Sequence, residues 1–575
     1  MSETISVSAI QFEPIQFEKA RNLDQLAYWV EQAAKTGSKL IVTPEMGTTG
    51  YCWESREEVE PFVEPIPGAT TDRFAALAHR YNCYIVIGMP EVDPVDDLYY
   101  NAAVLLGPEG IVGKHRKTHP YISEPKWAAS GNLGHPVFDT PIGKIALLIC
   151  MDIHFVETAR IAGLSQALII CHLSNWLAER TPAPYWINRA FENGCYLIES
   201  NRWGCERGVQ FSGGSCIIEP DGTVQTSIDS GDGVLHGVVD PAKVLPRQSM
   251  LLAARRPELY KELAAHTFCW NPLPFFDLYG LSPLPKGKHS RIAVGQFMPG
   301  SDSLKNMSFI IEQAATAKAQ HAELIVFPEL SLSGPFLSPR SALTPHGGDV
   351  SALIRLALQL HMHIVAGLVE EDSGRFYNSA VVVGPEGLVG RYRKIHLNEH
   401  DKTWATAGSH WQSFDLPFGR MGMLIGDDVL LPESARILSL RGCDLIACPA
   451  ALNAPRPWAH AGTSIALVAP IPTGADQYHW HLPRVRAGEN NVYMAFANSF
   501  DLEQDTYGAS GLFGPDTFAF PRNEAMITVA SGCIAMTIDT SNLDTPYPTN
   551  VVRRKDLVSM RQPHHYSALW QTSAS

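Results

Sequence analysis

The chain has 575 residues, of which 45% are hydrophobic and 18% charged, and its net charge at neutral pH is −14. This composition is that of a globular protein, and the negative charge, spread along the chain, argues against nucleic acid or an anionic membrane as a partner. The N-terminal sequence lacks the basic and apolar regions of a signal peptide, and no apolar run approaches the ~20 residues of a membrane span. The eleven cysteines are scattered without C-x-x-C pairs, which predicts a reduced, cytoplasmic protein.

Strand-like and helix-like segments alternate along the first half of the chain. Buried strands are predicted from continuous apolar runs, and helices from apolar residues spaced three to four apart. A hairpin is predicted where two such strands meet at Gly107–Gly110. In chain order these segments are a strand at 6–12, a helix at 22–37, a strand at 39–45, a helix at 71–82, a strand at 84–91, the hairpin at 101–117, a strand at 144–150, a helix at 155–166 and a strand at 167–175. The alternation indicates an α/β fold whose strands are buried on both faces.

The second half of the chain repeats the first. "LIVTPEM" around Glu45 returns as "LIVFPEL" around Glu329, and "YNAAVLLGPEGIVGKHRKTH" returns as "YNSAVVVGPEGLVGRYRKIH". The segments "RRPELYKEL" and "VRRKDLVSM" close the two halves in a similar way. The repeat therefore predicts two domains, 1–265 and 289–575, joined by a linker at 266–288 that is rich in proline, glycine and aromatic residues.

Three residues with useful chemistry lie near the ends of predicted strands in the first half. Glu45 follows the strand "KLIV", Lys117 lies in "HRKTH" after the hairpin, and Cys150 follows "KIALLI". Taken singly, a glutamate in such a place is usually a helix cap or surface charge, a basic cluster is usually solvated, and a lone cysteine is usually a small core residue. Their order and context give them a second interpretation.

The ordered set of motifs resembles the carbon–nitrogen hydrolase (nitrilase) superfamily. The resemblance rests on "PE" after an apolar strand, "RK-x-H" after a hairpin, and "IC-x-D" followed by Glu157, together with "SNW", "NRAFENGCYLIESN" and "GGSCIIEPDG" further along. It implies a four-layer αββα sandwich in each half, with the two halves forming an intramolecular pseudo-dimer. It also implies a catalytic triad in which Glu45 is the general base, Lys117 the oxyanion stabiliser and Cys150 the nucleophile, with Glu124 as a supporting acid. The backbone N–H of Met151 is expected to donate to the same oxyanion.

The second half has lost the nucleophile. Glu329, Lys394 and Asp401 correspond to Glu45, Lys117 and Glu124, but Gly426 stands where Cys150 is expected. Neither Asp427 nor Asp428 replaces a thiol, because a carboxylate is a poor nucleophile toward an amide. The second half is therefore predicted to be a pseudo-catalytic domain that acts as a built-in dimer partner, with further homo-oligomers also open.

Within the resemblance, the residues after the cysteine favour an amide substrate. Nitrile-cleaving members usually carry tryptophan directly after the cysteine, where this chain has Met151. Carbamoyl-cleaving members usually carry an arginine three or four positions after the cysteine, where this chain has Ile153 and His154. The predicted substrate-binding residues are Met151, His154, Tyr51, Trp53, Trp127 and Trp176. The sequence thus predicts an amidase acting on a small molecule. It leaves open N-carbamoyl hydrolysis, nitrile hydrolysis, acyl transfer, and a non-catalytic binding or regulatory protein on the same fold.

No cofactor or metal is predicted. The closely spaced histidines, His479 with His481 and His564 with His565, lack companion cysteine or acidic residues at ligand spacing.

Overall fold

The structure is a computed structural model that describes residues 3–177, 181–266, 283–339, 342–452, 481–501, 506–516, 523–527, 530–542 and 549–571. The described residues up to Ala253 form one compact unit, and those from Ala254 onward form a second. His479 and most of the predicted linker lie outside the described residues.

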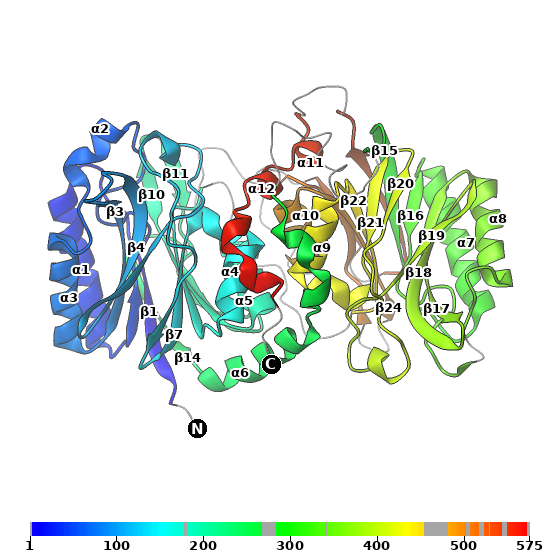
Figure 1. The fold of residues 1–575 in the computed structure, drawn as a ribbon, viewed down its shortest axis with the longest axis horizontal. Coiled ribbons are helices and arrows are strands. Elements are labelled where there is room, and N and C mark those ends of the chain that lie inside the picture. Colours follow the sequence, from blue (N-terminus) through cyan, green and yellow to red (C-terminus); the bar gives the residue numbers. More distant parts are fainter. Residues whose placement is uncertain are drawn as a thin grey trace. The chain divides into compact units, whose positions relative to one another are not determined.

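The first unit is built on two six-stranded sheets (Figure 1). In spatial order, the first sheet contains β14 (Gly233–Val239), β1 (Ile5–Gln11), β2 (Leu40–Val42), β3 (Tyr84–Val92), β4 (Tyr99–Gly107) and β5 (Gly110–Arg116). The second contains β13 (Val224–Ser227), β12 (Cys216–Ile218), β9 (Tyr196–Asn201), β8 (Ile169–Ser174), β7 (Gly143–Ile149) and β6 (Val137–Thr140). A separate ribbon pairs β10 (Trp203–Glu206) with β11 (Val209–Ser212).

The two sheets pack face to face through strands that are parallel at the centre of each sheet. β1, β2 and β3 are parallel neighbours, as are β7, β8 and β9, and β1 lies against β9. The helices of this unit are α1 (Lys19–Lys35), α2 (Arg56–Val59), α3 (Ala69–Tyr81), α4 (Val156–Leu164), α5 (Pro184–Asn193) and α6 (Pro241–Ala254). α1 and α3 cover the outer face of the first sheet, and α4 and α5 that of the second. The layers are therefore α, β, β and α, as predicted.

The hydrophobic periodicity of α1 explains its place in this sandwich. Its buried residues, Leu26, Val30, Ala33 and Ala34, recur at helical spacing and form one stripe. That stripe packs with Phe74 and Leu77 of α3 on the apolar side chains of the first sheet. The remaining faces of α1 carry the charged residues.

The second unit repeats this architecture. Its first sheet, in spatial order, contains β19 (Gly387–Arg393), β18 (Arg375–Gly384), β17 (His363–Asp372), β16 (Leu324–Val326), β15 (His289–Gln296) and β28 (Gly532–Asp539). Its second contains β20 (Ser413–Leu416), β21 (Gly419–Met423), β22 (Leu445–Ala450), β23 (Tyr493–Asn498), β26 (Ser510–Phe513) and β27 (Glu524–Ile527), and β24 (Phe500–Asp501) pairs with β25 (Thr506–Tyr507). The helices are α7 (Ser303–Ala319), α8 (Gly348–Leu360), α9 (Pro432–Leu440), α10 (His481–Asn490), α11 (Val551–Arg554) and α12 (Asp556–Ser559).

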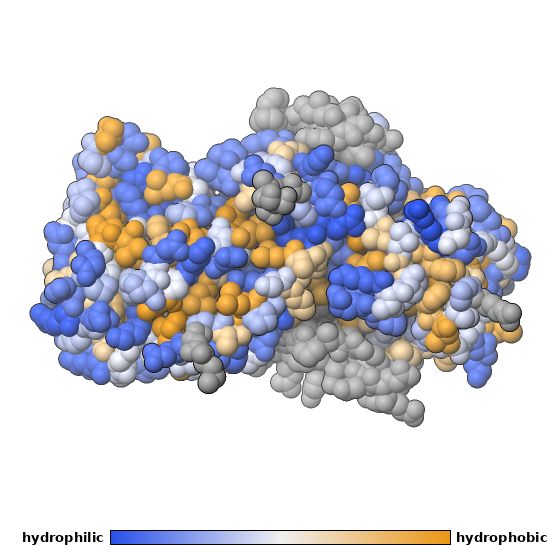
Figure 2. Space-filling model, turned by 60° about the horizontal axis from the view of Figure 1, so that its bottom comes forward, coloured by the Kyte–Doolittle hydropathy of each residue, from blue (hydrophilic) through white to orange (hydrophobic). Residues whose placement is uncertain are grey.

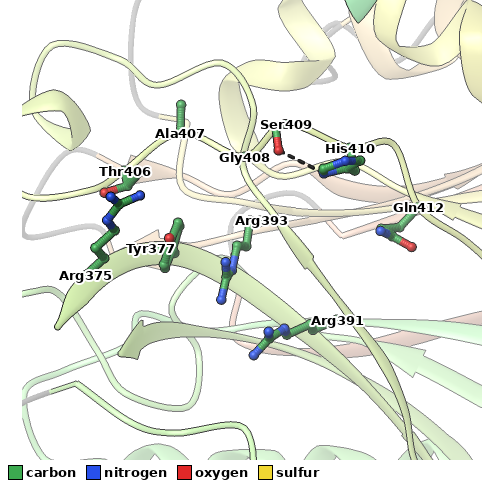
Figure 3. Close-up of a pocket in the computed structure, with 10 residues that line it drawn as sticks. All are labelled: Arg375, Tyr377, Arg391, Arg393, Thr406, Ala407, Gly408, Ser409, His410 and Gln412. Carbon is green, nitrogen blue, oxygen red and sulfur yellow. Dashed lines mark hydrogen bonds between the residues drawn. The ribbon is translucent and has the colours of Figure 1, made fainter. Parts of the chain in front are cut away.

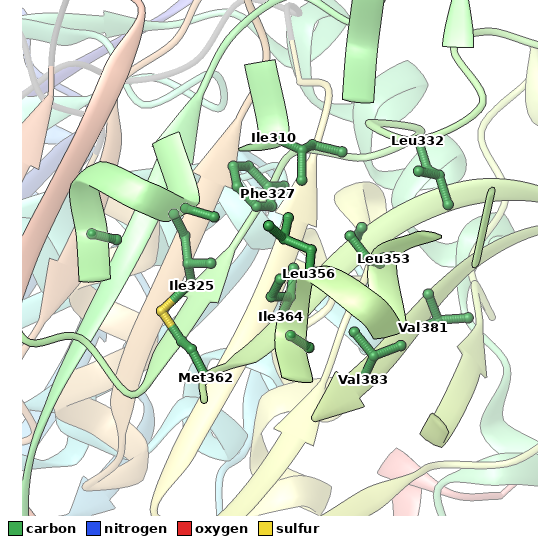
Figure 4. Close-up of a cluster of buried hydrophobic side chains, with 14 of the residues drawn as sticks. Ile310, Ile325, Phe327, Leu332, Leu353, Leu356, Met362, Ile364, Val381 and Val383 are labelled. Carbon is green, nitrogen blue, oxygen red and sulfur yellow. The ribbon is translucent and has the colours of Figure 1, made fainter. Parts of the chain in front are cut away.

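The core of the second unit lies between its first sheet and the helices α7 and α8. Figure 4 shows Ile310, Ile325, Phe327, Leu353 and Ile364 meeting in this layer, and each of these side chains is fully buried. On the surface, hydrophilic residues cover much of the face drawn in Figure 2, with apolar residues between them. No helix in the described part of the chain has both the length and the apolar character needed to cross a bilayer.

The boundary between the units differs from the boundary expected from the repeat. The predicted first domain ends at residue 265, whereas the segment Ala254–Ala265 groups with the second unit. Within that unit, the Tyr260 hydroxyl lies 2.8 Å from Nε2 of His396, and Glu262 forms an ion pair with Arg441. The closing motif of the first half therefore packs on the second unit.

Candidate active site

Strand ends bring three of the predicted residues of the first unit together. Glu45 lies just beyond β2, Lys117 directly follows β5, and Cys150 directly follows β7. The first two come from one sheet and the cysteine from the other, so the face-to-face packing of the sheets is what joins them. All three side chains are buried.

Lys117 is held by two carboxylates. Its Nζ lies 2.8 Å from Oε1 of Glu45 and 2.5 Å from Oε2 of Glu124, and both glutamates are 0% exposed. Burial alone lowers the pKa of Lys117, but the charges of Glu124 and Glu45 outweigh it and hold that pKa well above its ordinary value. Lys117 is therefore positively charged at neutral pH. Glu124, predicted as a supporting acid, lies inside the cluster.

Two asparagines fix the orientation of the Glu45 carboxylate. Nδ2 of Asn101 donates to Oε1 of Glu45 at 2.7 Å and to Oε1 of Glu124 at 2.6 Å. Nδ2 of Asn175 donates to the other oxygen of Glu45 at 2.9 Å and to its main-chain carbonyl at 3.2 Å. Neither asparagine was predicted as a site residue. The signal was present for Asn101, because its motif "YNAAV" returns as "YNSAV", with Asn378 in the second half.

Cys150 stands at the start of a tight turn. The 3₁₀ turn Cys150–His154 begins with a φ of +43° at the cysteine, a left-handed conformation that residues with side chains rarely adopt. Burial raises the pKa of the Cys150 thiol, and the charge of Glu45 raises it further, while Lys117 opposes them. The resting thiol is consequently protonated at neutral pH.

Asp152 anchors this turn to the first sheet. Its carboxylate lies 2.9 Å from Nε2 of His115 and 3.2 Å from Nδ1 of His119, and it accepts a hydrogen bond from the Thr118 hydroxyl at 2.8 Å. Burial opposes ionisation of Asp152, but the hydrogen bonds and charges of the two histidines hold its pKa well below its usual range. Because Thr118 follows Lys117, this contact ties the lysine strand to the cysteine turn.

The predicted substrate-binding residues divide into two groups. His154 stacks on Trp176 with ring centroids 4.9 Å apart and also contacts Tyr185, so it is buried rather than facing solvent.

The Tyr51 hydroxyl donates to Glu124 at 3.3 Å. Trp53 instead packs between Phe17 and Phe62 and donates to the carbonyl of Gly50. Trp127 lies in the same apolar cluster as Tyr51 and Trp53, and Met151 is buried directly after the cysteine.

The second unit retains the charged residues, but a glutamate side chain occupies the space where the thiol would lie. Lys394 contacts Glu329 at 2.9 Å, Asp401 at 2.6 Å and Asp427 at 2.7 Å. A Cβ atom built at Gly426 would lie only 2.4 Å from Oε2 of Glu329. Burial raises the pKa of Glu329 to about 7. Three carboxylates thus surround one lysine where the first unit has two, and the glutamate fills the space that a cysteine would need.

In the parts of both units that the structure describes, no group of three or more histidine, cysteine, aspartate or glutamate side chains is arranged to hold a metal ion.

Comparisons with known proteins identify the family of this chain. The carbon–nitrogen hydrolase family model matches twice, over residues 6–245 and 291–525. A nitrilase from Pyrococcus abyssi is 38% identical over 221 residues, covering 38% of this chain and 83% of the relative. An omega-amidase from Homo sapiens is 32% identical over 226 residues, covering 37% of this chain and 74% of the relative. A crystal structure of a carbon–nitrogen hydrolase from Helicobacter pylori aligns with a TM-score of 0.42 at 25% identity, covering 45% of this chain and 98% of that chain. The chain therefore belongs to the carbon–nitrogen hydrolase family, whose domain it carries twice, and is a hydrolase acting on carbon–nitrogen bonds.

Proposed function

We propose that the first unit is an amidase that hydrolyses a small carboxamide to an acid and ammonia or an amine, through a thioester on Cys150. The observation that carries this proposal is the buried Glu45–Lys117–Glu124 cluster next to a cysteine on a left-handed turn. The second unit keeps the charged part of this cluster but has a glycine at the cysteine position. One chain thus contains a complete site and an incomplete copy of it.

The chemistry follows from the charges. Glu45 takes the thiol proton as the sulfur attacks the amide carbon, and burial, which raises the pKa of Glu45, makes it a better base than an exposed glutamate. Lys117 and the backbone N–H of Met151 stabilise the oxyanion that forms. The amine leaves with a proton from Glu45. Water, activated by Glu45, then attacks the thioester and releases the acid and the free thiol.

The roles of Asn101 and Asn175 follow from the same geometry. Each donates to a different oxygen of Glu45, so the carboxylate is oriented from both sides. A base fixed in this way transfers a proton without first having to rotate into place. We assign both asparagines as positioning residues for Glu45.

The buried aromatic residues favour an apolar or aromatic substrate. His154 of the cysteine turn stacks on Trp176 and contacts Tyr185 at a tilt, and Tyr51 contacts Glu124. Such side chains bind an apolar acyl group by contact area. Met151 in place of tryptophan favours amides over nitriles. Hydrolysis of N-carbamoyl compounds and acyl transfer to an amine use the same residues and remain alternative outcomes of the test.

The second unit is assigned the role of an internal partner. Gly426 replaces the cysteine and the Glu329 side chain occupies the adjacent space, so the second unit has no thiol to form the acyl-enzyme by the route of the first unit. A tandem chain supplies its own second domain at high effective concentration. We assign it a supporting role toward the catalytic unit in an intramolecular pseudo-dimer in the cytoplasm.

Intact-protein mass spectrometry tests the proposed function. The wild-type chain and Cys150→Ala are mixed with a panel of carboxamides, carbamoyl compounds and nitriles, while ammonia release is followed in parallel. The expected result is ammonia from a carboxamide and an acyl adduct that requires Cys150. Turnover that survives in Cys150→Ala would contradict the site, and the absence of both adduct and ammonia across the panel would favour a non-catalytic binding protein.

A further inference from the structure

A buried histidine–glutamate pair lies behind the cysteine turn of the first unit. His172 of β8 and Glu199 of β9 are register partners on parallel strands, and both are 0% exposed. Nε2 of His172 lies 3.1 Å from the main-chain carbonyl oxygen of Cys150, and Nδ1 contacts the Glu199 carboxylate. The Ser174 hydroxyl donates to the other oxygen of Glu199. None of these three residues has a part in the mechanism above.

The contact with the carbonyl fixes where the protons of the pair lie. A carbonyl oxygen only accepts hydrogen bonds, so Nε2 of His172 must carry a hydrogen. A proton shared between Nδ1 and Glu199 leaves that hydrogen in place, whether the pair is an imidazolium with a carboxylate or a neutral imidazole with a carboxylic acid. His172 is therefore a donor to the Cys150 carbonyl in both states.

Holding this carbonyl also orients the next N–H. The peptide unit is planar and trans, so the carbonyl of Cys150 and the N–H of Met151 point in opposite directions. We infer that His172, supported by Glu199, is a positioning residue that aims the Met151 N–H at the substrate oxyanion. This inference rests on the proposed thioester mechanism. It also explains how the strained left-handed φ of Cys150 is maintained.

The second unit has lost the pair together with the nucleophile. β22 and β23 keep the register of β8 and β9, but they place Cys448 opposite Phe496 where the first unit has His172 opposite Glu199. Ala450 stands at the position of Ser174. Gly426 still adopts a left-handed φ of +47°, which glycine does without strain. The turn therefore forms in the second unit without the pair. The pair is present only in the unit that has the nucleophile, which agrees with a catalytic rather than a purely structural role.

The test separates oxyanion stabilisation from placement of the thiol. His172→Leu removes the donor, and His172→Gln restores an N–H near the place of Nε2. For each variant, kcat and KM of amide hydrolysis are compared with the rate at which iodoacetamide alkylates Cys150. Alkylation displaces iodide at a saturated carbon and forms no oxyanion, so it depends on the thiol and its base but not on the Met151 N–H.

The expected result is a fall in kcat of about 10²–10³-fold in His172→Leu, with KM and the alkylation rate nearly unchanged. His172→Gln should recover most of kcat. An equal fall in alkylation and kcat would show that the pair only supports the fold, and an unchanged kcat would also overturn the inference. If the proposed function itself is wrong, the wild-type chain will not hydrolyse amides. Failure of the inference alone leaves the wild-type activity intact, so the two failures are distinguished.

An independent observation concerns a cavity of about 310 Å³ in the second unit. Arg375, Arg391 and Arg393 line it, and no acidic side chain does. Figure 3 shows Tyr377 between Arg375 and Arg393, with the loop 406–412 along the opposite side. Behind the cavity, Arg391 and Arg393 both pair with Glu370 and Asp372. Three guanidinium groups against two carboxylates leave one positive charge for a ligand.

Comparison with the first unit shows which of these groups are specific to the second: Arg391 and Arg393 correspond to Lys114 and Arg116, whereas Arg375 has no cationic counterpart. Counting from the repeated "YN" motif, Leu98 and Leu133 stand at the positions of Arg375 and His410. Asn132, which accepts from Nη1 of Arg116 at 3.0 Å, is replaced by Ser409, whose hydroxyl bonds to His410. Among the described residues, Nη1 of the corresponding Arg393 has no acceptor. The second unit thus has more positive charge and an available donor at this place.

We propose that this cavity binds a small monocarboxylate. Guanidinium groups match the planar carboxylate, and a single net positive charge fits a monoanion better than a phosphate dianion. Isothermal titration of the full chain with acetate and benzoate, against inorganic phosphate, tests this at low salt.

Saturable carboxylate binding should weaken at least tenfold in Arg375→Leu and remain in Arg355→Leu, an exposed arginine on α8 that serves as the matched control. Preference for phosphate, equal effects of the two variants, or no saturable binding would each overturn the proposal.

Discussion

Substituting Gly426 by alanine asks whether the second site is truly closed. The added Cβ would lie 2.4 Å from Oε2 of Glu329 and 3.1 Å from Nζ of Lys394. The glutamate cannot simply swing away, because its Oε1 already accepts from Lys394 at 2.9 Å and from Asn378 at 2.6 Å. The matched control is Cys150→Ala, which has nearly the same backbone conformation in the first unit, where the Cβ already fits.

The expected loss of stability comes from two effects and one offset. A side chain at a left-handed φ costs about 1–2 kcal/mol, and overpacking of a buried site costs about 1–3 kcal/mol. Replacing a glycine lowers the conformational entropy of the unfolded chain, which offsets about 0.4–1 kcal/mol of this loss. The net destabilisation of the second unit by Gly426→Ala is therefore about 1–5 kcal/mol. Cys150→Ala adds no atom and no new strain.

Calorimetry of the full chain, with hydrogen exchange of peptides covering residues 419–428, measures this difference. At roughly 2–4 °C per kcal/mol for a domain of this size, Gly426→Ala should lower the transition temperature of the second unit by roughly 2–20 °C. It should also speed exchange around the turn, whereas Cys150→Ala leaves that transition in place. An unchanged transition in Gly426→Ala would show that Glu329 yields the space freely and would refute the closed-site reasoning.

Three further outcomes follow from the site. Because burial raises the pKa of Glu45, the acid limb of the pH profile of kcat/KM should lie above the ordinary glutamate pKa of 4.5. An acid limb at or below that value would contradict the role of Glu45 as a buried base. Lys117→Met leaves Glu45 and Glu124 facing each other without a cation, so it should cost about 3–5 kcal/mol in denaturant unfolding and lower kcat at least ~10²-fold, while the exposed Lys126→Met changes neither. A fragment of residues 1–288 should be less stable and less active than the full chain in the same assays, and full activity from it would contradict the partner role of the second unit.

Much of the fold was predictable because its signals are local. Apolar runs of strand length and apolar residues at helical spacing define β1, α1, β3 and the β4–β5 hairpin without reference to distant residues. The repeat then fixed the second unit by comparison with the first. Details of length were less accessible, since the strand predicted at 39–45 is only Leu40–Val42, and Glu45 lies in the turn beyond it.

The supporting residues of the site could not be found in this way. Asn175 follows a strand of the second sheet, and its contact with Glu45 depends on how that sheet is positioned on the first. His172 contacts the Cys150 carbonyl from the neighbouring strand of the same sheet, so this contact depends on strand order and register. Trp53 and Trp176 are both tryptophans close to a site motif, but Trp53 packs with Phe17 and Phe62. Its direction is set by backbone geometry after β2, which periodicity does not report.

The sequence by itself determined that the chain carries two copies of one domain, that Glu45, Lys117 and Cys150 belong to one ordered set, and that Gly426 breaks the set in the second copy. These are comparisons of residue against residue along the chain. Only the tertiary structure decided that Glu329 fills the space of the missing thiol and that His172 holds the Cys150 carbonyl. The reason is physical: such contacts join side chains from different strands and sheets, and a displacement of one ångström, invisible in sequence, makes or breaks them.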